Sequence, residues 1–201
     1  MNDLLQMKRL IPGGICPVMV SDIPKPIFEE IKGWVKIARK LKDHPLAELR
    51  AHENVGYKHE TDNVKHNSYQ CSVPAHLLEQ SFWLGWIIRL SAKYYGQGLN
   101  QRAFALRDNV GHFDRYDMWV NFARKGDDNP THNHAGFLSG VIYVENDGQP
   151  TLFDEFGCEY EGKNGTMVLF PSQTLHHVEE KTTKKERVTL AFNIIKLADG
   201  P

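Results

Sequence analysis

The chain has 201 residues, of which 41% are hydrophobic and 24% charged, with a formal net charge of -1. These values are typical of one globular domain with a substantial core, and the near-neutral charge argues against a dedicated nucleic-acid-binding protein. No apolar stretch indicates a signal peptide or a membrane span, so we expect a cytoplasmic protein. The three cysteines, Cys16, Cys71 and Cys158, form no CxxC pair, which indicates reduced thiols and not disulfides.

The first half of the chain is predicted to be mainly helical. Apolar residues recur at helical spacing over 27–41, after two prolines, and again over 75–95, where a Gly-Gln-Gly sequence ends the pattern. We therefore expect residues 1–110 to form a helical supporting region. A polar stretch between the two helices carries three histidines, which we interpret as surface residues: His52, His59 and His66.

After residue 110 the pattern changes to short strand-like runs, separated by turn sequences such as KGDDNP and EGKNG. Many short strands in so short a segment favour a sandwich or barrel over a parallel sheet. We therefore expect one domain over 1–201: a mainly β jelly roll over 111–197, with the N-terminal helices packed on one sheet. The predicted strands cover residues 116–124, 137–145, 150–153, 166–171, 175–180 and 187–196.

Two histidines one residue apart, His132 and His134, lie in the sequence NPTHNHAG just before a predicted strand. In an extended segment, side chains at positions i and i+2 leave the same face, so both imidazoles can reach one metal ion. A third histidine, His176, follows the strand over 166–171 and the proline that ends it. Taken singly, each histidine is equally well explained as a polar residue on a turn.

The last predicted strand, RVTLAFN, places Arg187, Thr189 and Asn193 on one face. An arginine that faces the interior of a barrel is unfavourable without an anion. A carboxylate, which accepts two parallel hydrogen bonds from a guanidinium, is its natural partner. The simpler alternative is an ion pair with Glu179 or Glu180 across a hairpin.

The order His-x-His, distal His and Arg-x-Thr resembles that of the iron(II)- and 2-oxoglutarate-dependent oxygenases, which have a double-stranded β-helix fold. It looks most similar to a prolyl-hydroxylase-like subfamily of marine bacteria and phages. The resemblance covers roughly residues 115 to 195. The segments that carry it are Trp119-Val120-Asn121, His132-Asn133-His134, Ser139-Gly140, Phe170-Pro171-Ser172, His176 and Glu186 to Asn193.

The resemblance implies a dioxygenase that binds Fe(II) and uses 2-oxoglutarate and O2 as cosubstrates. Such an enzyme releases succinate while it hydroxylates a small-molecule or peptide substrate. By the same resemblance, the metal ligands are His132, His134 and His176, and 2-oxoglutarate is held by Arg187, Thr189 and Asn121.

His134 departs from the family pattern, which usually has a carboxylate at this position. Three assignments stay open. All three histidines bind the metal, as in cupin dioxygenases; or one histidine of the pair binds and Asp154 or Glu155 completes the site; or the pattern is His134-Ala135-Gly136 with no carboxylate, as in halogenating members of the superfamily. The first needs no rearrangement, because both side chains of the pair already face the same way.

Two other functions stay open at this point. A cupin-type dioxygenase that does not use 2-oxoglutarate is supported by the spacing of Gly165, Pro171 and His176. It lacks the glutamate expected after His-x-His. A jelly-roll binding module without turnover would use the same histidines for recognition. The loops expected to select the substrate cover 54–72, 125–133 and 154–164. Their mixed polar composition does not identify the substrate, and the sequence does not indicate the oligomeric state.

Overall fold

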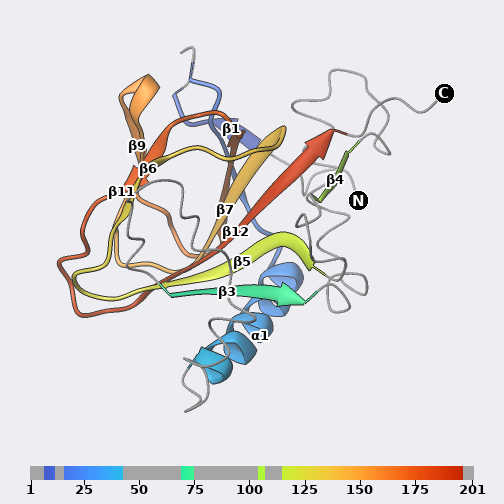
Figure 1. The fold of residues 1–201 in the computed structure, drawn as a ribbon, viewed down its shortest axis with the longest axis vertical. Helices are drawn as coiled ribbons and strands as arrows, with labels where there is room; N and C mark the ends of the chain where they lie inside the picture. Colours follow the sequence, from blue (N-terminus) through green and yellow to red (C-terminus); the bar gives the residue numbers. More distant parts are fainter. Residues whose placement is uncertain (1–6, 12–15, 43–68, 75–103, 107–114, 197–201) are drawn as a thin grey trace.

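The computed structural model describes residues 7–11, 16–42, 69–74, 104–106 and 115–196 (Figure 1). The predicted helix over 75–95 and the histidines at 52, 59 and 66 lie outside these residues. The described elements are, in chain order, β1 (Met7–Arg9), β2 (Met19–Asp22), α1 (Lys25–Lys42), β3 (Tyr69–Pro74), β4 (Phe104–Leu106), β5 (Arg115–Ala123), β6 (Asn129–His132), β7 (Leu138–Glu145), β8 (Thr151–Phe153), the 3-10 turn η2 (Asp154–Phe156), β9 (Cys158–Tyr160), β10 (Thr166–Pro171), β11 (His176–Val178) and β12 (Arg187–Lys196).

Two antiparallel sheets make up the described β structure. The large sheet has eight strands in the order β1-β2-β10-β7-β12-β5-β3, with β4 also paired to β12. The small sheet has four strands in the order β6-β11-β8-β9. The predicted mainly β architecture is therefore confirmed.

Every strand predicted after residue 110 is present in the structure, and the strands over 166–171 and 187–196 have the predicted bounds. The sequence did not indicate β6 and β9. β6 contains Pro130, which removes a backbone donor and made the segment resemble a turn. It lies at the edge of the small sheet, where a proline is tolerated.

We expected a helical supporting region over residues 1–110, but the described part of this region also contains strands. It supplies β1 to β4 to the large sheet as well as α1. Residues 69–72, predicted to belong to a loop, lie in β3 and pair with β5. Strands β1 and β4 have three residues each, too few for a period-2 pattern to be recognised.

Helix α1 covers the outer face of the large sheet, below β3 and β5 in the view of Figure 1. Its residues Ile31, Val35 and Ala38 recur at helical spacing and are buried against that face. Burial of each large apolar side chain contributes about 1.5–3 kcal/mol. This helix confirms the prediction over 27–41. Among the described residues, no helix is both long and apolar enough to cross a lipid bilayer.

The two faces of the large sheet differ in character. On β12, Val188, Leu190 and Phe192 belong to the apolar cluster under α1. The alternating residues Arg187 and Thr189 are buried on the inner face, as the period-2 pattern predicted. A second apolar cluster fills the space between the sheets, and its buried members are Cys16, Val18, Tyr143, Phe153, Val168 and Phe170.

Candidate metal centre

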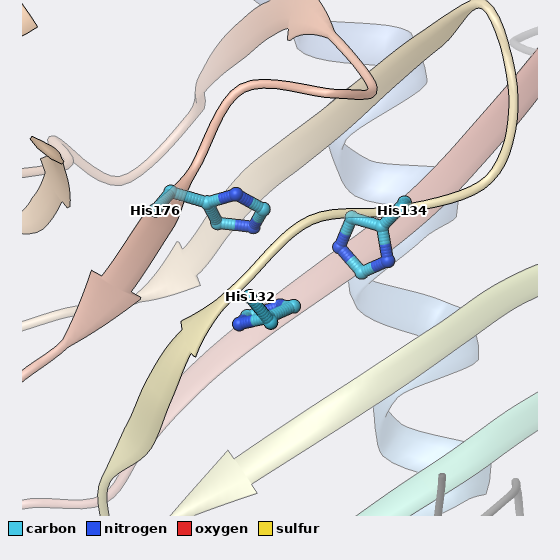
Figure 2. A group of neighbouring side chains, drawn as sticks. All are labelled: His132, His134 and His176. Atoms are coloured by element: carbon cyan, nitrogen blue, oxygen red, sulfur yellow. The ribbon is translucent and has the colours of Figure 1, made fainter. Parts of the chain in front are cut away.

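The three predicted histidines lie together in the structure (Figure 2). His132 ends β6, His176 begins β11, and these two residues pair directly across the ladder. His134 lies in the segment just after β6. The possible ligand nitrogens of all three lie within 4.8 Å of one another, close enough to hold one metal ion. Among the described residues, this is the only group of three or more His, Cys, Asp or Glu side chains with such geometry.

Backbone carbonyls fix the proton on two of these rings. Nδ1 of His132 lies 2.7 Å from the carbonyl oxygen of Pro130, and Nδ1 of His176 lies 2.9 Å from that of Thr174. A carbonyl oxygen only accepts hydrogen bonds, so each Nδ1 must carry the proton. The lone pair of each ring then lies on Nε2, the arrangement typical of ligating histidines.

Burial keeps His176 in the form that binds metals. The side chain is 4% exposed. Loss of hydration and, after it, the neighbouring His132 lower its pKa to about 3, although the hydrogen bond to Thr174 opposes the shift. The ring is therefore neutral throughout the physiological pH range. His132 and His134 are half-buried, so the centre lies close to solvent.

A network of motif residues fixes the backbone at His134. Its N–H donates to the carbonyl of Ser172 over 2.8 Å. The Ser139 hydroxyl lies 3.0 Å from that of Ser172 and 2.5 Å from Oδ1 of Asn193. Since Oδ1 only accepts, Ser139 donates to Asn193 and Ser172 donates to Ser139. Ser139, Ser172 and Asn193 belong to the motifs named in the sequence analysis, but the sequence did not show that they contact one another.

Gly136 brings this network close to the histidine segment. Its φ of +144° lies in a region that other residues rarely adopt. A Cβ atom there would lie 3.0 Å from Oγ of Ser172 and 3.2 Å from the carbonyl oxygen of Ile194. The glycine of NPTHNHAG is therefore required both by its backbone conformation and by the close packing.

The alternative carboxylate ligands lie elsewhere. Asp154 and Glu155 are exposed in η2. Oδ1 of Asp154 lies 2.7 Å from Nδ1 of His177, the half-buried neighbour of His176. Neither carboxylate is part of the histidine group.

Arg187 lies on the inner face of β12 and is 6% exposed. Its Nη2 donates to Oγ1 of Thr151 over 3.1 Å, and the guanidinium lies 5.5 Å from the centre of the Tyr143 ring. The Tyr143 hydroxyl also donates to Thr151, over 2.8 Å. Glu179 and Glu180, the predicted alternative partners, are exposed, and Arg187 forms no ion pair with any residue that the structure describes.

Burial of Arg187 has an electrostatic cost that this environment does not offset. Loss of hydration lowers the pKa of Arg187, and interactions with Tyr143 and Asp147 act in the opposite direction. Its Nε is buried without a hydrogen-bond partner. A buried guanidinium with an unused donor and no adjacent carboxylate in the described structure fits an anionic ligand.

Asn121 and Thr189 lie opposite each other on β5 and β12, as partners in register. Nδ2 of Asn121 donates to Oγ1 of Thr189 over 3.3 Å, and Nε1 of Trp119 donates to Oδ1 of Asn121 over 3.0 Å. The Trp119 ring centre lies 5.7 Å from that of His134. These contacts link the histidine group to β12. The roles of Trp119, Tyr143 and Thr151 were not foreseen from the sequence.

Comparisons with known proteins agree with this arrangement. A family model described as "Putative 2OG-Fe(II) oxygenase" matches residues 155–193, a segment that includes His176, Arg187 and Thr189. No curated protein matches the sequence significantly.

Several solved structures have a similar fold. The viral collagen prolyl hydroxylase of Paramecium bursaria Chlorella virus-1 has a TM-score of 0.56 at 13% identity, covering 90% of this chain and 98% of that one. An oxidoreductase of the 2OG-Fe(II) oxygenase family from Burkholderia pseudomallei has a TM-score of 0.61 at 15% identity, with coverage of 94% and 93%. A Pseudomonas putida prolyl-4-hydroxylase has 0.53 at 16% identity, with coverage of 90% and 94%.

At these identities the solved structures show the fold, and they confirm the double-stranded β-helix. The family match adds the chemistry. The match over residues 155–193 indicates an oxidoreductase of the non-haem iron, 2-oxoglutarate-dependent type, which works with Fe(II), 2-oxoglutarate and O2, and the histidine group fits iron. The resemblance to a subfamily of marine bacteria and phages stays a prediction.

Proposed function

We propose that this protein hydroxylates a small-molecule or peptide substrate, with Fe(II) bound by His132, His134 and His176 and 2-oxoglutarate bound by Arg187. The observation that carries this proposal is the pairing of two features inside one barrel. Three histidines converge, and Nδ1 of two of them faces a backbone carbonyl, which leaves the lone pair of the ring on Nε2. A buried arginine lacks a carboxylate partner among the described residues. Both features contact the apolar cluster between the sheets, His176 through Phe170 and Arg187 through Tyr143.

The donor set fits ferrous iron. Imidazole nitrogen is a ligand that Fe(II) accepts, and three protein ligands leave positions for cosubstrates. Bound there, Fe(II) supplies the redox chemistry that couples decarboxylation of 2-oxoglutarate to oxidation of the substrate. Three neutral imidazoles leave the full charge of the ion uncompensated, so the C1 carboxylate of 2-oxoglutarate is attracted more strongly than at a site with a protein carboxylate.

The residues on β7, β8 and β12 would hold the other end of 2-oxoglutarate. Arg187 offers its buried Nε and a second nitrogen to the distal carboxylate, which suits a bidentate contact. Tyr143 and Thr151 already orient the guanidinium and bring two hydroxyl groups to the same place. Thr189 and Asn121, joined by their own hydrogen bond, would line the neighbouring wall.

A peptide that contains proline is the first substrate class to test. Two of the three solved structures compared above are named as prolyl hydroxylases. Of the predicted loop 125–133, residues 129–132 form β6 in the structure, and its last residue is His132, so this segment leads into the centre that the substrate must approach.

The all-histidine set favours one second candidate, the cupin-type dioxygenase that does not use 2-oxoglutarate. The two candidates differ in what Arg187 is for. Only the first requires an anion at the buried guanidinium.

The test is anaerobic addition of Fe(II) and then 2-oxoglutarate to the metal-free protein. We expect a weak visible charge-transfer band that needs both additions, and succinate release once O2 is admitted. Arg187→Ala should raise the concentration of 2-oxoglutarate that gives half of the band and leave Fe(II) binding intact. If the iron-loaded protein gives neither band nor succinate, 2-oxoglutarate is not its cosubstrate. Turnover of a substrate with O2 alone would then identify the cupin-type alternative.

A further inference from the structure

Two cysteines that are far apart in sequence meet between the sheets. Sγ of Cys16 lies 3.1 Å from Sγ of Cys158, although 142 positions separate them. Both are free thiols in the structure. A bonded pair lies at about 2.05 Å, so a shift of roughly 1 Å joins them. Their sequence spacing gave no indication of this contact.

The two thiols lie at edges of the two sheets. Cys158 begins β9, the edge strand of the small sheet. Cys16 precedes β2, which lies next to the edge strand β1 of the large sheet. Both contact the apolar cluster between the sheets. A bond between them would therefore fasten one sheet to the other at an edge where only side-chain packing has been described.

Cys158 also lies in register with the metal centre. Cys158 pairs with Phe153, Phe153 pairs with His176, and His176 pairs with His132, across the four strands of the small sheet. Directly paired residues of antiparallel strands project to the same face. One row of side chains therefore runs across the small sheet from Cys158, at the thiol contact, to His176 and His132.

We propose that Cys16 and Cys158 form a disulfide that joins the two sheets of the barrel. The oxidant is a small-molecule disulfide of the glutathione type. The thiolate of Cys158 attacks one sulfur of the oxidant and releases a small thiol, which leaves a mixed disulfide. Cys16 loses its proton, attacks Sγ of Cys158 and releases the second small thiol. In sum, two protein thiols and one small disulfide give one protein disulfide and two small thiols.

The surroundings set the order and the speed of these steps. Cys16 is 1% exposed, whereas Cys158 is partly exposed between the exposed residues Gly157 and Glu159. The oxidant therefore meets Cys158 first. Burial and, after it, the contact with Cys16 raise the pKa of the Cys158 thiol to about 12. Little thiolate is then present at neutral pH, so the bond forms slowly. The pair reacts too slowly to act as a fast peroxide sensor.

Cys71 provides a matched control within the same chain. It is buried in the cluster under α1, on the outer face of the large sheet. The large sheet therefore separates it from the other two sulfur atoms. Cys71→Ser should leave the proposed bond unchanged, whereas Cys158→Ser should abolish it.

The experiment compares full-length protein kept in reduced and in oxidised glutathione, without iron or 2-oxoglutarate. After alkylation under denaturing conditions and proteolysis, mass spectrometry should find a peptide containing Cys16 joined to one containing Cys158 in the oxidised sample alone. The midpoint of thermal unfolding should rise by roughly 5–15 °C, because a cross-link over a long loop restricts the unfolded chain. Cys71→Ser should show the same rise, and Cys158→Ser none.

Three thiols that all stay free in oxidised glutathione would overturn the proposal. So would joined peptides that contain Cys71, or a bond between two chains, seen as a dimer on a non-reducing gel. The peptide analysis needs only the wild-type protein, so the result stands even if a serine variant folds poorly.

Discussion

His176 and His132 face each other across β11 and β6 as directly paired residues, with their ring centres 4.3 Å apart. Two of the three proposed ligands are therefore separated by the spacing of a β-ladder, which the backbone hydrogen bonds keep constant. The third, His134, lies outside the ladder and depends on Ser172 for its backbone position. The centre thus combines a rigid pair with a ligand held by a turn.

Replacement of His176 by alanine should lower Fe(II) affinity by more than about 100-fold, beyond the 10- to 100-fold that loss of a supporting partner costs. The matched control is His177→Ala, because His177 lies next in sequence but contacts Asp154 instead. It should retain metal. Fe(II) titration under anaerobic conditions measures both. Equal affinities in the two variants would contradict the ligand assignment.

Loss of the Arg187 guanidinium should weaken 2-oxoglutarate binding by roughly 100- to 1,000-fold, because each hydrogen bond to a charged group contributes about 1.5–3 kcal/mol. Arg187→Lys keeps the charge but loses the bidentate contact, so its loss should be intermediate. Tyr143→Phe removes one hydroxyl and should cost roughly 10-fold. Calorimetric titration of the metal-loaded protein measures these changes. A Lys variant that binds like wild type would show that charge alone matters.

The sequence predicted the second half of the molecule better than the first. β10 is an apolar run that follows the turn sequence EGKNG, and β12 alternates after the polar sequence KTTKKE, so the bounds of both strands were foreseen. β3 was not, because an apparently polar segment is a strand only through its pairing with β5. The order of the motifs along the chain, compared with the family pattern, also predicted which three histidines lie together.

Contacts made in three dimensions could not be read from the sequence. Tyr143 and Thr151 join the Arg187 pocket only because β7, β8 and β12 converge there. The network of Ser139, Ser172 and Asn193 likewise spans three strands or turns. No local pattern indicates such a contact, because each residue is unremarkable in its own segment.

Gly136→Ala should weaken metal binding without removing any ligand. The φ of +144° and the short distances from a new Cβ to Ser172 and Ile194 force the segment to move. His134, two residues away, would move with it, and we expect roughly a 10-fold loss of Fe(II) affinity, the lower end of the range for lost support. The control is Gly148→Ala, where a Cβ meets nothing within 4 Å but φ is also positive, at +94°. If both variants bind iron equally weakly, backbone strain and not this packing would be responsible.

The stability of the metal-free protein should decline as pH falls below about 6.5. His176 in the folded chain takes up a proton only near pH 3, whereas in the unfolded chain it does so near its ordinary value of 6.5. The unfolded state therefore binds more protons between these values, and stability falls with falling pH across this window. Between about pH 8 and 4 the contribution of His176 is on the order of 3 kcal/mol. Urea unfolding of wild type and His176→Gln measures it. Parallel curves for the two proteins would rule out this origin.

Ile31→Ala should destabilise the fold by about 2–5 kcal/mol, the usual cost of such a truncation in a core. Ile31 is completely buried between α1 and the outer face of the large sheet. Because the proposed centre lies on the other face, Fe(II) affinity at temperatures below unfolding should stay unchanged. Urea unfolding and metal titration of the same preparation test both halves of this prediction. A matching loss of affinity would show that the two faces are coupled.

The alternation along β12 has a consequence for how such a protein can change. Neighbouring positions have different functions. Val188, Leu190 and Phe192 pack in the cluster under α1, while Arg187 and Thr189 face the interior where the chemistry is proposed. A library that varies only inward positions of β5, β7 and β12 would alter what enters the barrel and leave the helix contacts untouched. New reactivity can then be selected on a scaffold whose folding free energy is set by the other half of the same strands.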